Sequence, residues 1–249
     1  MALRLLSLLT SGIASRQTCE ICRGECRGPL PLCPGCIAQL PWIRRGCASC
    51  GEPMTTGHPL CFRCQQHPLP FAEVIIPLRY AYPVDQWIGF YKYQSKPGMA
   101  RWLSRLLQAR VEQHMQHRPT LITGVPMHPQ KQRERGYNQS LLLARHLARA
   151  LELPFDAHLL QKPKVTSHQR TLNAASRRLN LQGAFNVREN SSWGRANPLP
   201  IEGQHIAVVD DVVTTGATSA EIAQCLLGAG AASVSLWALA KTQLHTPQA

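Results

Sequence analysis

The sequence predicts an α/β protein with an open sheet, preceded by a small cysteine-rich module. Three observations support this prediction. Residues 206–218 form a buried strand, a turn and the start of a helix, and β-rich segments alternate with segments of helical periodicity before it. Eight cysteines recur at regular intervals near the N-terminus. An apolar content of 44% with 16% charged residues suits a chain that buries a core.

The N-terminal segment, residues 1–18, is predicted to be amphipathic. Leu3, Leu6 and Leu9 share the face of a short helix that could cover the domain. Arg4 interrupts the apolar run, which argues against a signal peptide. No stretch reaches the roughly 18 consecutive apolar residues of a membrane helix. We therefore expect a cytoplasmic protein without a membrane span.

The cysteines of residues 19–68 are predicted to bind two structural Zn²⁺ ions. Each of four C-x-x-C pairs begins 14 residues after the one before: Cys19 and Cys22, Cys33 and Cys36, Cys47 and Cys50, Cys61 and Cys64. Two pairs complete a tetrahedral Cys₄ site. Neighbouring pairs are the simpler pairing, although equal spacing also permits a cross-braced one. Disulfides would need a secreted chain, and iron–sulfur spacing is absent. Cys26 is expected to be a thiol that binds no metal. Cys225 is expected to pack as a small hydrophobic residue.

The elements between residues 69 and 152 follow from periodicity. Residues 71–82 are predicted to form a strand, and residues 121–126 the first strand of the α/β core, which ends in a loop at 125–129. A helix over residues 99–115 is expected to bury Trp102, Leu103, Leu106, Leu107 and Val111 and to expose Arg101, Arg105 and Arg110. Residues 131–152 are predicted to be one continuous helix.

Positive charge is concentrated in the middle of the chain. Residues 91–189 hold 17 Lys and Arg against 5 Asp and Glu, within a total net charge of +13. Lys131, Arg133 and Arg135 crowd the start of the predicted 131–152 helix, where cations oppose the helix dipole. A second basic segment, residues 162–185, is expected to be a mobile loop and a short helix able to fold over a ligand. This distribution indicates a partner that carries phosphates.

Two adjacent acids mark the predicted ligand edge. The strand of residues 206–209 is expected to end at Val209, so that Asp210 and Asp211 follow it and Thr214–Thr218 opens the next helix. Free N–H groups at a helix start favour an anion, and carboxylates accept hydrogen bonds from sugar hydroxyls. The thirteen residues IAVVDDVVTTGAT resemble the phosphoribosyl pyrophosphate (PRPP) signature of type I phosphoribosyltransferases. The plainer alternative is an ordinary strand and helix with threonine caps. A Walker A loop is a poor alternative because no Gly-Lys-Ser/Thr follows the glycine.

Further motifs extend the resemblance over nearly the whole chain. They are Val125-Pro126, Arg135-Gly136-Tyr137-Asn138-Gln139, Gln169-x-x-Leu172-x₄-Arg177-x-x-Asn180, and Gly183-Ala184-Phe185, between the cysteines and the paired acids. With the cysteine module, this order resembles the ComF family of competence-associated proteins, in particular its GntX-like members. The resemblance implies a type I phosphoribosyltransferase-like fold over residues 69–249, an open, mostly parallel sheet with flanking helices. It also implies a double zinc ribbon over 19–68. Any base-recognition hood must come from residues 71–118, where no purine- or pyrimidine-reading pattern is found.

The same resemblance assigns roles to residues. Asp210 and Asp211 would hold the ribose hydroxyls of PRPP, with Mg²⁺ bridging ribose and pyrophosphate oxygens. The 5′-phosphate would lie on Thr214, Thr215, Gly216, Ala217 and Thr218. The pyrophosphate would lie on Val125, Pro126, Met127, His128 and Arg135. Asp210, Asp211 and Arg135 would be the catalytic residues of any transfer reaction.

Three functions remain open at this point. The first is an enzyme that displaces pyrophosphate from PRPP with a nitrogen nucleophile. The second is a binding protein for PRPP and single-stranded DNA in DNA uptake, processing or utilisation, with other uptake or recombination proteins as partners. Tyr137, Tyr91, Tyr93 and Trp102 could stack bases, although Trp102 also suits the core. The third is a nucleobase or amine phosphoribosyltransferase of nucleotide metabolism without a DNA role.

Overall fold

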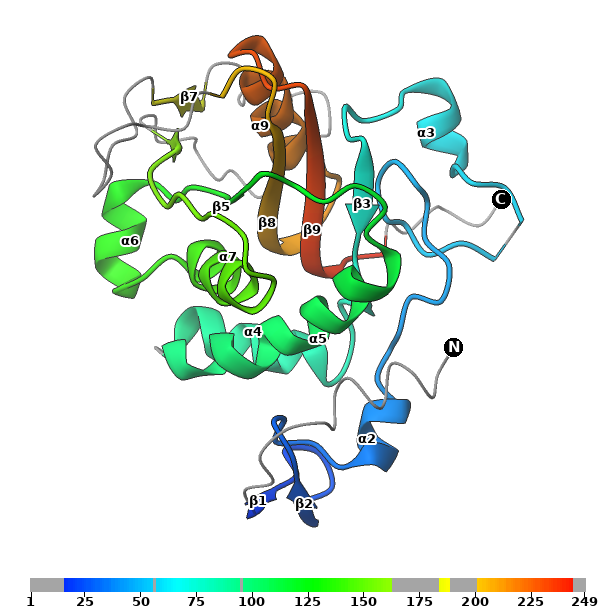
Figure 1. The fold of residues 1–249 in the computed structure, drawn as a ribbon. Coiled ribbons are helices and arrows are strands. Elements are labelled where there is room, and N and C mark those ends of the chain that lie inside the picture. The colour runs from blue at the N-terminus through cyan, green and yellow to red at the C-terminus, as the bar shows by residue number, and fades with distance from the viewer. Residues whose placement is uncertain (1–15, 56, 95, 163–183, 189–200, 244–249) are drawn as a thin grey trace.

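The structure, a computed structural model, describes residues 16–55, 57–94, 96–162, 184–188 and 201–243 (Figure 1). The predicted amphipathic segment lies almost entirely outside these ranges, as do the motif residues Gln169 to Asn180 of the second basic segment.

A parallel sheet forms the centre of the protein (Figure 1). Its strands run in the order β3 (Glu73–Ile75), β9 (Ser233–Lys241), β8 (His205–Val213) and β5 (Leu121–Gly124), and β4 (Leu78–Arg79) also pairs with β9. Every pairing in this sheet is parallel. The predicted open sheet is therefore confirmed. The prediction that residues 121–126 open the core is wrong, because β3 already pairs with β9.

Helices cover both faces of this sheet. The side chains of Ala207, Val209, Trp237 and Leu239 pack in one cluster with α5 (Ala100–His114) and α7 (Gln139–Ala150). The alternate residues Ile206, Val208 and Val234 pack with α9 (Ala217–Gly228) on the other side. Because successive residues of a strand point to opposite faces, both faces of the central strands are apolar, as in α/β proteins.

The predicted helix over residues 131–152 is two helices. The first, α6, spans Pro129–Arg135, and α7 begins at Gln139. Gly136 separates them with a φ of +83°, a conformation that favours glycine because it carries no Cβ. Asn138 then caps α7, since its side chain accepts a hydrogen bond from the Leu141 N–H at 3.1 Å. The break brings Arg135 and Ser140 together beside the sheet edge.

A helix that the sequence analysis missed, α4, spans Val84–Tyr93 and is followed by a short 3₁₀ helix, η1 (Pro97–Met99). Its buried residues are Val84, Trp87, Ile88 and Tyr91. Trp87 packs edge to face with Trp102 of α5, the ring centroids 5.0 Å apart. The prediction that Arg110 is exposed is wrong, because its guanidinium donates to the Ile43 carbonyl at 2.9 Å.

The cysteine-rich module forms two separate groups of four sulfurs. Cys19, Cys22, Cys33 and Cys36, here the first cysteine set, lie near β1 (Arg16–Thr18), β2 (Glu25–Arg27) and α2 (Pro34–Ala38). Cys47, Cys50, Cys61 and Cys64, the second cysteine set, lie near α3 (Phe62–Gln66). Neighbouring pairs therefore share a site, as the simpler pairing predicts. Cys26 is buried and belongs to neither set.

The two sets lie at opposite faces of the sheet. Buried residues around the first set, such as Leu32 and Ile37, share one cluster with α4 and α5. Ile43 and Ile76 pack with Val213, Leu236 and Ala238 on the other face, beside the second set. Figure 1 shows β1 and β2 below α4 and α5, and α3 beyond β3. Within the described ranges, no helix has the length and apolarity needed to cross a bilayer.

Candidate functional site

The paired acids lie inside β8, not beyond its end. The predicted end of this strand at Val209 is wrong, because pairing with β9 continues through Val212 and Val213. Asp210 lies opposite Ala238, and both acids are buried, with Asp211 only 2% exposed. Val212 and Val213 extend the strand past the acids, so the acids are part of the sheet.

The loop after β5 begins beside Asp210. Gly124 is in register with Val209, and the Val125 N–H donates to the Val209 carbonyl at 2.9 Å. The Asn138 amide donates to the Val125 carbonyl at 3.0 Å, which ties this loop to the start of α7. The segment Val125–His128 is therefore held along the carboxyl edge of the sheet, where ligands bind in open α/β proteins.

Gly124 allows α7 to approach the sheet closely. A Cβ on Gly124 would lie 2.8 Å from the backbone of Ser140 and Leu141. This close approach brings the Ser140 hydroxyl into reach of Asp210, to whose Oδ1 it donates at 2.9 Å. The Asp211 N–H donates to the same oxygen, also at 2.9 Å. Two donors thus fix one oxygen of the Asp210 carboxylate.

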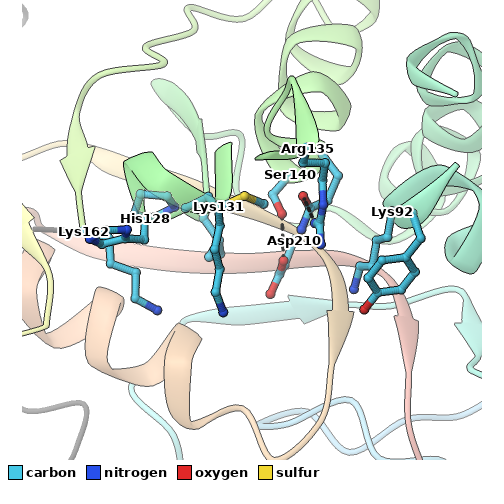
Figure 2. Close-up of a pocket in the computed structure, with 12 residues that line it drawn as sticks. Lys92, His128, Lys131, Arg135, Ser140, Lys162 and Asp210 are labelled. Carbon is cyan, nitrogen blue, oxygen red and sulfur yellow. Dashed lines mark hydrogen bonds between the residues drawn. The ribbon is translucent and has the colours of Figure 1, made fainter. Parts of the chain in front are cut away.

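A cavity of about 300 Å³ opens at this edge. Figure 2 shows basic side chains arranged around Asp210, with Lys162, His128 and Lys131 on one side and Lys92 on the other. The cavity is lined by Lys92, Tyr93, Val125, Pro126, Met127, His128, Lys131, Arg135, Gln139, Ser140, Lys162 and Asp210. Among these described lining residues, Asp210 is the only carboxylate. The pocket therefore offers one acid surrounded by cations.

Burial and neighbouring charges set the ionisation of the acids and bases. Burial, together with the charge of Asp211, raises the pKa of Asp210 to about 7. Lys92 forms an ion pair with Asp211, Nζ to Oδ2 at 2.8 Å. Burial acts to lower the pKa of Lys92, but the Asp211 and Asp210 carboxylates outweigh it and leave this pKa above its usual value. Lys92 therefore stays protonated beside the paired acids.

The remaining cations lie along the α6 side of the pocket. Burial and the charge of Lys131 lower the pKa of Lys162. The two lysines repel each other, and a bound anion would offset this repulsion. Arg135 donates to the Gln139 side chain at 2.7 Å and lies 5.4 Å from the centroid of the Tyr93 ring. These contacts hold the guanidinium at the rim of the pocket.

The motif residues 135–139 build the pocket wall. Tyr137 donates from its hydroxyl to the Tyr91 carbonyl, and Tyr91 donates in turn to the Gln139 carbonyl at 2.8 Å. The expectation that Tyr91 could stack bases is wrong, because this side chain is fully buried. Tyr137 is half-buried, and Tyr93 is 78% exposed. Of the four aromatic residues suggested for stacking, Tyr93 is the one that faces solvent.

The threonine loop lies apart from this cavity lining. Thr214, Thr215, Gly216, Ala217 and Thr218 follow β8 and open α9, with Gly216 at a φ of +82°. The Ala217 N–H donates to the Thr215 hydroxyl at 3.3 Å. The structure therefore gathers Val125–His128, Arg135 and Asp210 in one cavity. Asp211 faces Lys92, and the Thr214–Thr218 loop lies just beyond the acids in the chain.

Both cysteine sets fit tetrahedral zinc. The four sulfurs of each set lie within 4.8 Å of one another. The Cys22–Cys33 and Cys50–Cys61 sulfurs are 3.8 Å and 3.7 Å apart, close to the edge of about 3.8 Å expected for a tetrahedron with Zn–S bonds of about 2.3 Å. The Cys33 N–H donates to the Cys19 sulfur at 3.4 Å and the Cys61 N–H to the Cys47 sulfur at 3.3 Å, contacts that favour the thiolate form of both sulfurs. None of the ten cysteines forms a disulfide.

The pocket residues could bind Mg²⁺ only together with a ligand that supplies further oxygen atoms. Mg²⁺ prefers six oxygen ligands in octahedral geometry. Asp210 alone lines the described cavity as a carboxylate, and Asp211 is paired with Lys92. The chain thus offers too few oxygens for an all-protein site, whereas a pyrophosphate would supply its own.

Two lining residues were not singled out from the sequence. Lys92 comes from the missed helix and Ser140 from the start of α7. A signal for α4 exists, because its buried residues Val84, Trp87, Ile88 and Tyr91 have the spacing of one helix face. No local pattern would pair Lys92 with Asp211, since that contact depends on how α4 packs against the sheet.

The comparisons with known proteins find relatives over nearly the whole chain, although no family model matches it. The chain is 37% identical over 227 residues to the DNA utilization protein YhgH of Escherichia coli (strain K12), covering 87% of this chain and 95% of that protein. It is 32% identical over 226 residues to Competence protein F of Haemophilus influenzae, with the same coverage. Competence protein ComFC of Bacillus subtilis is 31% identical over 123 residues, 49% of this chain and 45% of that protein.

Solved structures that resemble the chain are more distant. An adenine phosphoribosyltransferase matches with a TM-score of 0.36 and 18% identity, over 60% of this chain and 72% of that one. The orotate phosphoribosyltransferase of Aeropyrum pernix matches with a TM-score of 0.33 and 22% identity, over 63% and 64%. Family membership rests on the two sequence relatives that each cover 87% of this chain. The chain belongs to the ComF family of competence and DNA utilization proteins.

Proposed function

We propose that this protein binds PRPP at the pocket around Asp210 and single-stranded DNA on the adjoining surface, as part of DNA uptake, processing or utilisation. The observation that carries the proposal is that a buried carboxylate and several basic side chains line one cavity at the carboxyl edge of the sheet. The buried Asp210, suited to sugar hydroxyls, lies in the same cavity as Lys131, Arg135 and Lys162, which suit a pyrophosphate. The Thr214–Thr218 loop would take the 5′-phosphate, and Mg²⁺ would enter with the ligand.

Calorimetry with PRPP and Mg²⁺ tests the pocket. We expect one PRPP per chain and a loss of affinity of about tenfold or more in the Asp210→Asn/Asp211→Asn variant, because hydrogen bonds to charged acceptors are lost. Asp85→Asn is the matched control, since Asp85 lies at the start of α4 and away from the pocket lining. Equal affinities in all three proteins would contradict the proposed pocket.

The same pocket could also support transfer of the phosphoribosyl group. Pyrophosphate release from PRPP, measured with bases, amines and oligonucleotides as acceptors, separates the two cases. A binding protein would leave PRPP intact, whereas an enzyme would release pyrophosphate with one of these acceptors. Release with a base or amine, in a protein that does not bind DNA, would favour the role in nucleotide metabolism.

The exposed face of α4 supports the DNA part of the proposal. Phe90 and Tyr93 lie three residues apart on one helix face and are 37% and 78% exposed. Lys96 lies 5.3 Å from the Phe90 ring centroid, and Arg135 lies beside Tyr93. Aromatic side chains among cations suit stacked bases and a phosphate backbone. Tyr93 also lines the cavity, so a bound strand would run up to the PRPP pocket.

Fluorescence anisotropy with a labelled single-stranded oligonucleotide tests this surface. We expect Tyr93→Ala to weaken binding by about tenfold, the loss of one stacked base. Phe62→Ala is the control, since Phe62 has the same exposure of 78% but lies on α3. Affinity should also fall steeply with salt. An equal effect of both substitutions, or affinity independent of salt, would contradict a binding surface on α4.

The proposal places the protein in the cytoplasm. The reducing conditions there keep the eight paired cysteines available for zinc. Proteins of DNA uptake or recombination would be its partners, in keeping with the names of its relatives, a DNA utilization protein and a competence protein.

A further inference from the structure

The Thr214–Thr218 loop is attached to the second cysteine set through an arginine. Arg63 lies in α3, between Cys61 and Cys64. Its guanidinium donates to the Thr215 carbonyl at 3.1 Å, across more than half of the sequence. Arg63 therefore joins the two segments, because its backbone lies between two cysteines of the second set and its guanidinium holds the loop.

A buried lysine makes a second attachment. Lys241, at the end of β9, is fully buried, and its Nζ donates to the Thr214 carbonyl at 2.6 Å. The same Nζ lies 2.8 Å from a carboxylate oxygen of Glu52. Glu52 belongs to the turn of the second cysteine set, since its carbonyl accepts a hydrogen bond from the Cys47 N–H at 2.8 Å. Charge and hydrogen bonds thus join this turn to the loop.

Close packing makes a third attachment. A Cβ on Gly216 would lie 2.7 Å from Cδ1 of Leu69, so the glycine fits directly against this side chain. Leu69 packs on Cys47, Cys50 and Cys64. Its N–H donates at 2.7 Å to the hydroxyl of Ser49, which lies between two of those cysteines. A shift of the turn that holds Cys47 and Cys50 would therefore move Leu69 and, through it, Gly216.

We propose that Arg63, Lys241 and Leu69 are positioning residues through which the second cysteine set holds the Thr214–Thr218 loop, so that zinc at this set and a phosphate on the loop stabilise each other. Coupling of this kind is reciprocal, because each ligand favours the arrangement that binds the other. The phosphate as ligand rests on the proposed function, whereas the link between cysteines and loop does not. The first cysteine set packs with α4 and α5 on the other face, so it serves as an internal control.

Amide hydrogen exchange of the zinc-loaded full chain, without any ligand, tests the link itself. We expect Arg63→Met to speed exchange in residues 214–220 by about fivefold, the effect of one net hydrogen bond, and to leave residues 125–128 unchanged. Arg23→Met is the matched control, since Arg23 follows Cys22 of the first set and its side chain is 73% exposed. Arg63→Lys keeps the charge and replaces Arg63→Met if that variant loses zinc. Unchanged exchange at 214–220 would overturn the proposal.

Cysteine alkylation in the presence of a chelator, read for each cysteine by mass spectrometry, tests the coupling. We expect PRPP with Mg²⁺ to slow alkylation of Cys47, Cys50, Cys61 and Cys64 by about fivefold in the wild-type protein, and to leave the first set unchanged. Arg63→Met should remove this protection. Equal protection of both sets, or none although calorimetry shows PRPP binding, would overturn the coupling. If calorimetry shows no PRPP binding, the proposed function fails and the exchange experiment still decides the link.

Discussion

At the scale of residues, Asp210 and Asp211 are chain neighbours with different partners. Asp210 accepts hydrogen bonds from Ser140 and from its own neighbour's N–H, whereas Asp211 forms the ion pair with Lys92. Two adjacent buried carboxylates repel each other, and Lys92 compensates one of them. A ligand that brings hydroxyl donors and a cation would stabilise both acids, which is the chemistry that the proposed function requires.

The raised pKa of Asp210 predicts a stability that depends on pH. Its folded pKa of about 7 lies above the usual value of 3.8, so the folded protein binds a proton that the unfolded chain has lost between these two values. Stability therefore falls as pH rises through this window and levels off above about 7. Asp210→Asn keeps the acceptor for Ser140 without the charge. We expect it to stabilise the free protein at pH 8.

Urea unfolding at several pH values measures this effect. The advantage of Asp210→Asn should shrink as pH falls towards 4, where the wild-type carboxyl is also neutral. Asp85→Asn provides the comparison for loss of a carboxylate outside the pocket. A difference between Asp210→Asn and wild type that stays constant from pH 4 to pH 8 would contradict the raised pKa.

At the scale of elements, local patterns predicted what depends on neighbours in the chain. The four C-x-x-C pairs predicted two groups of four sulfurs but left their pairing open, and the acid pair with its glycine turn predicted a strand followed by a helix. The break between α6 and α7 was missed although Gly136 stood in the sequence, because apolar residues continue with helical period on both sides. The contacts of Lys92, Arg63 and Lys241 were not predictable, since each depends on packing between distant segments.

Gly124 is predicted to control the distance between α7 and the sheet. Gly124→Ala would place a methyl group 2.8 Å from the backbone of Ser140 and Leu141, which a side-chain rotation cannot relieve. We expect this overpacking to cost about 1–3 kcal/mol in the free energy of unfolding and to weaken PRPP binding, because the Ser140–Asp210 contact is displaced. Urea unfolding and calorimetry measure the two effects.

Gly89→Ala is the matched control for that substitution. Gly89 lies within α4, and a Cβ there meets no atom within 4 Å. It should stabilise the protein by about 0.5–1 kcal/mol, because alanine is the better helix former. If Gly124→Ala left both stability and PRPP affinity at the wild-type values, the close approach of α7 would not matter for the pocket.

At the scale of the whole molecule, the two cysteine sets brace opposite faces of one sheet. The first packs in one cluster with α4 and α5, and the second contacts the Thr214–Thr218 loop. Of the two sets, the second is the one whose described contacts reach the proposed phosphate loop. A small module without catalytic groups of its own can thereby shape a pocket built from distant segments.

Elemental analysis is expected to find two zinc ions per chain, one for each set. Cys22→Ser and Cys50→Ser should each lower this to one, because a tetrahedral site loses a ligand. Cys26→Ser and Cys225→Ser are controls, since neither residue belongs to a set. Zinc content that falls equally in all four variants, or that is absent from the wild-type protein, would contradict the two-site assignment.

The most direct test is a crystal structure of the protein grown with PRPP and Mg²⁺. The account predicts the ribose hydroxyls on Asp210 and Asp211, with Lys92 displaced from Asp211. It places the pyrophosphate among Lys131, Arg135 and residues 125–128, and the 5′-phosphate on the Thr214–Thr218 loop. PRPP bound elsewhere, with the Lys92–Asp211 ion pair intact and the cavity filled only by solvent, would contradict it.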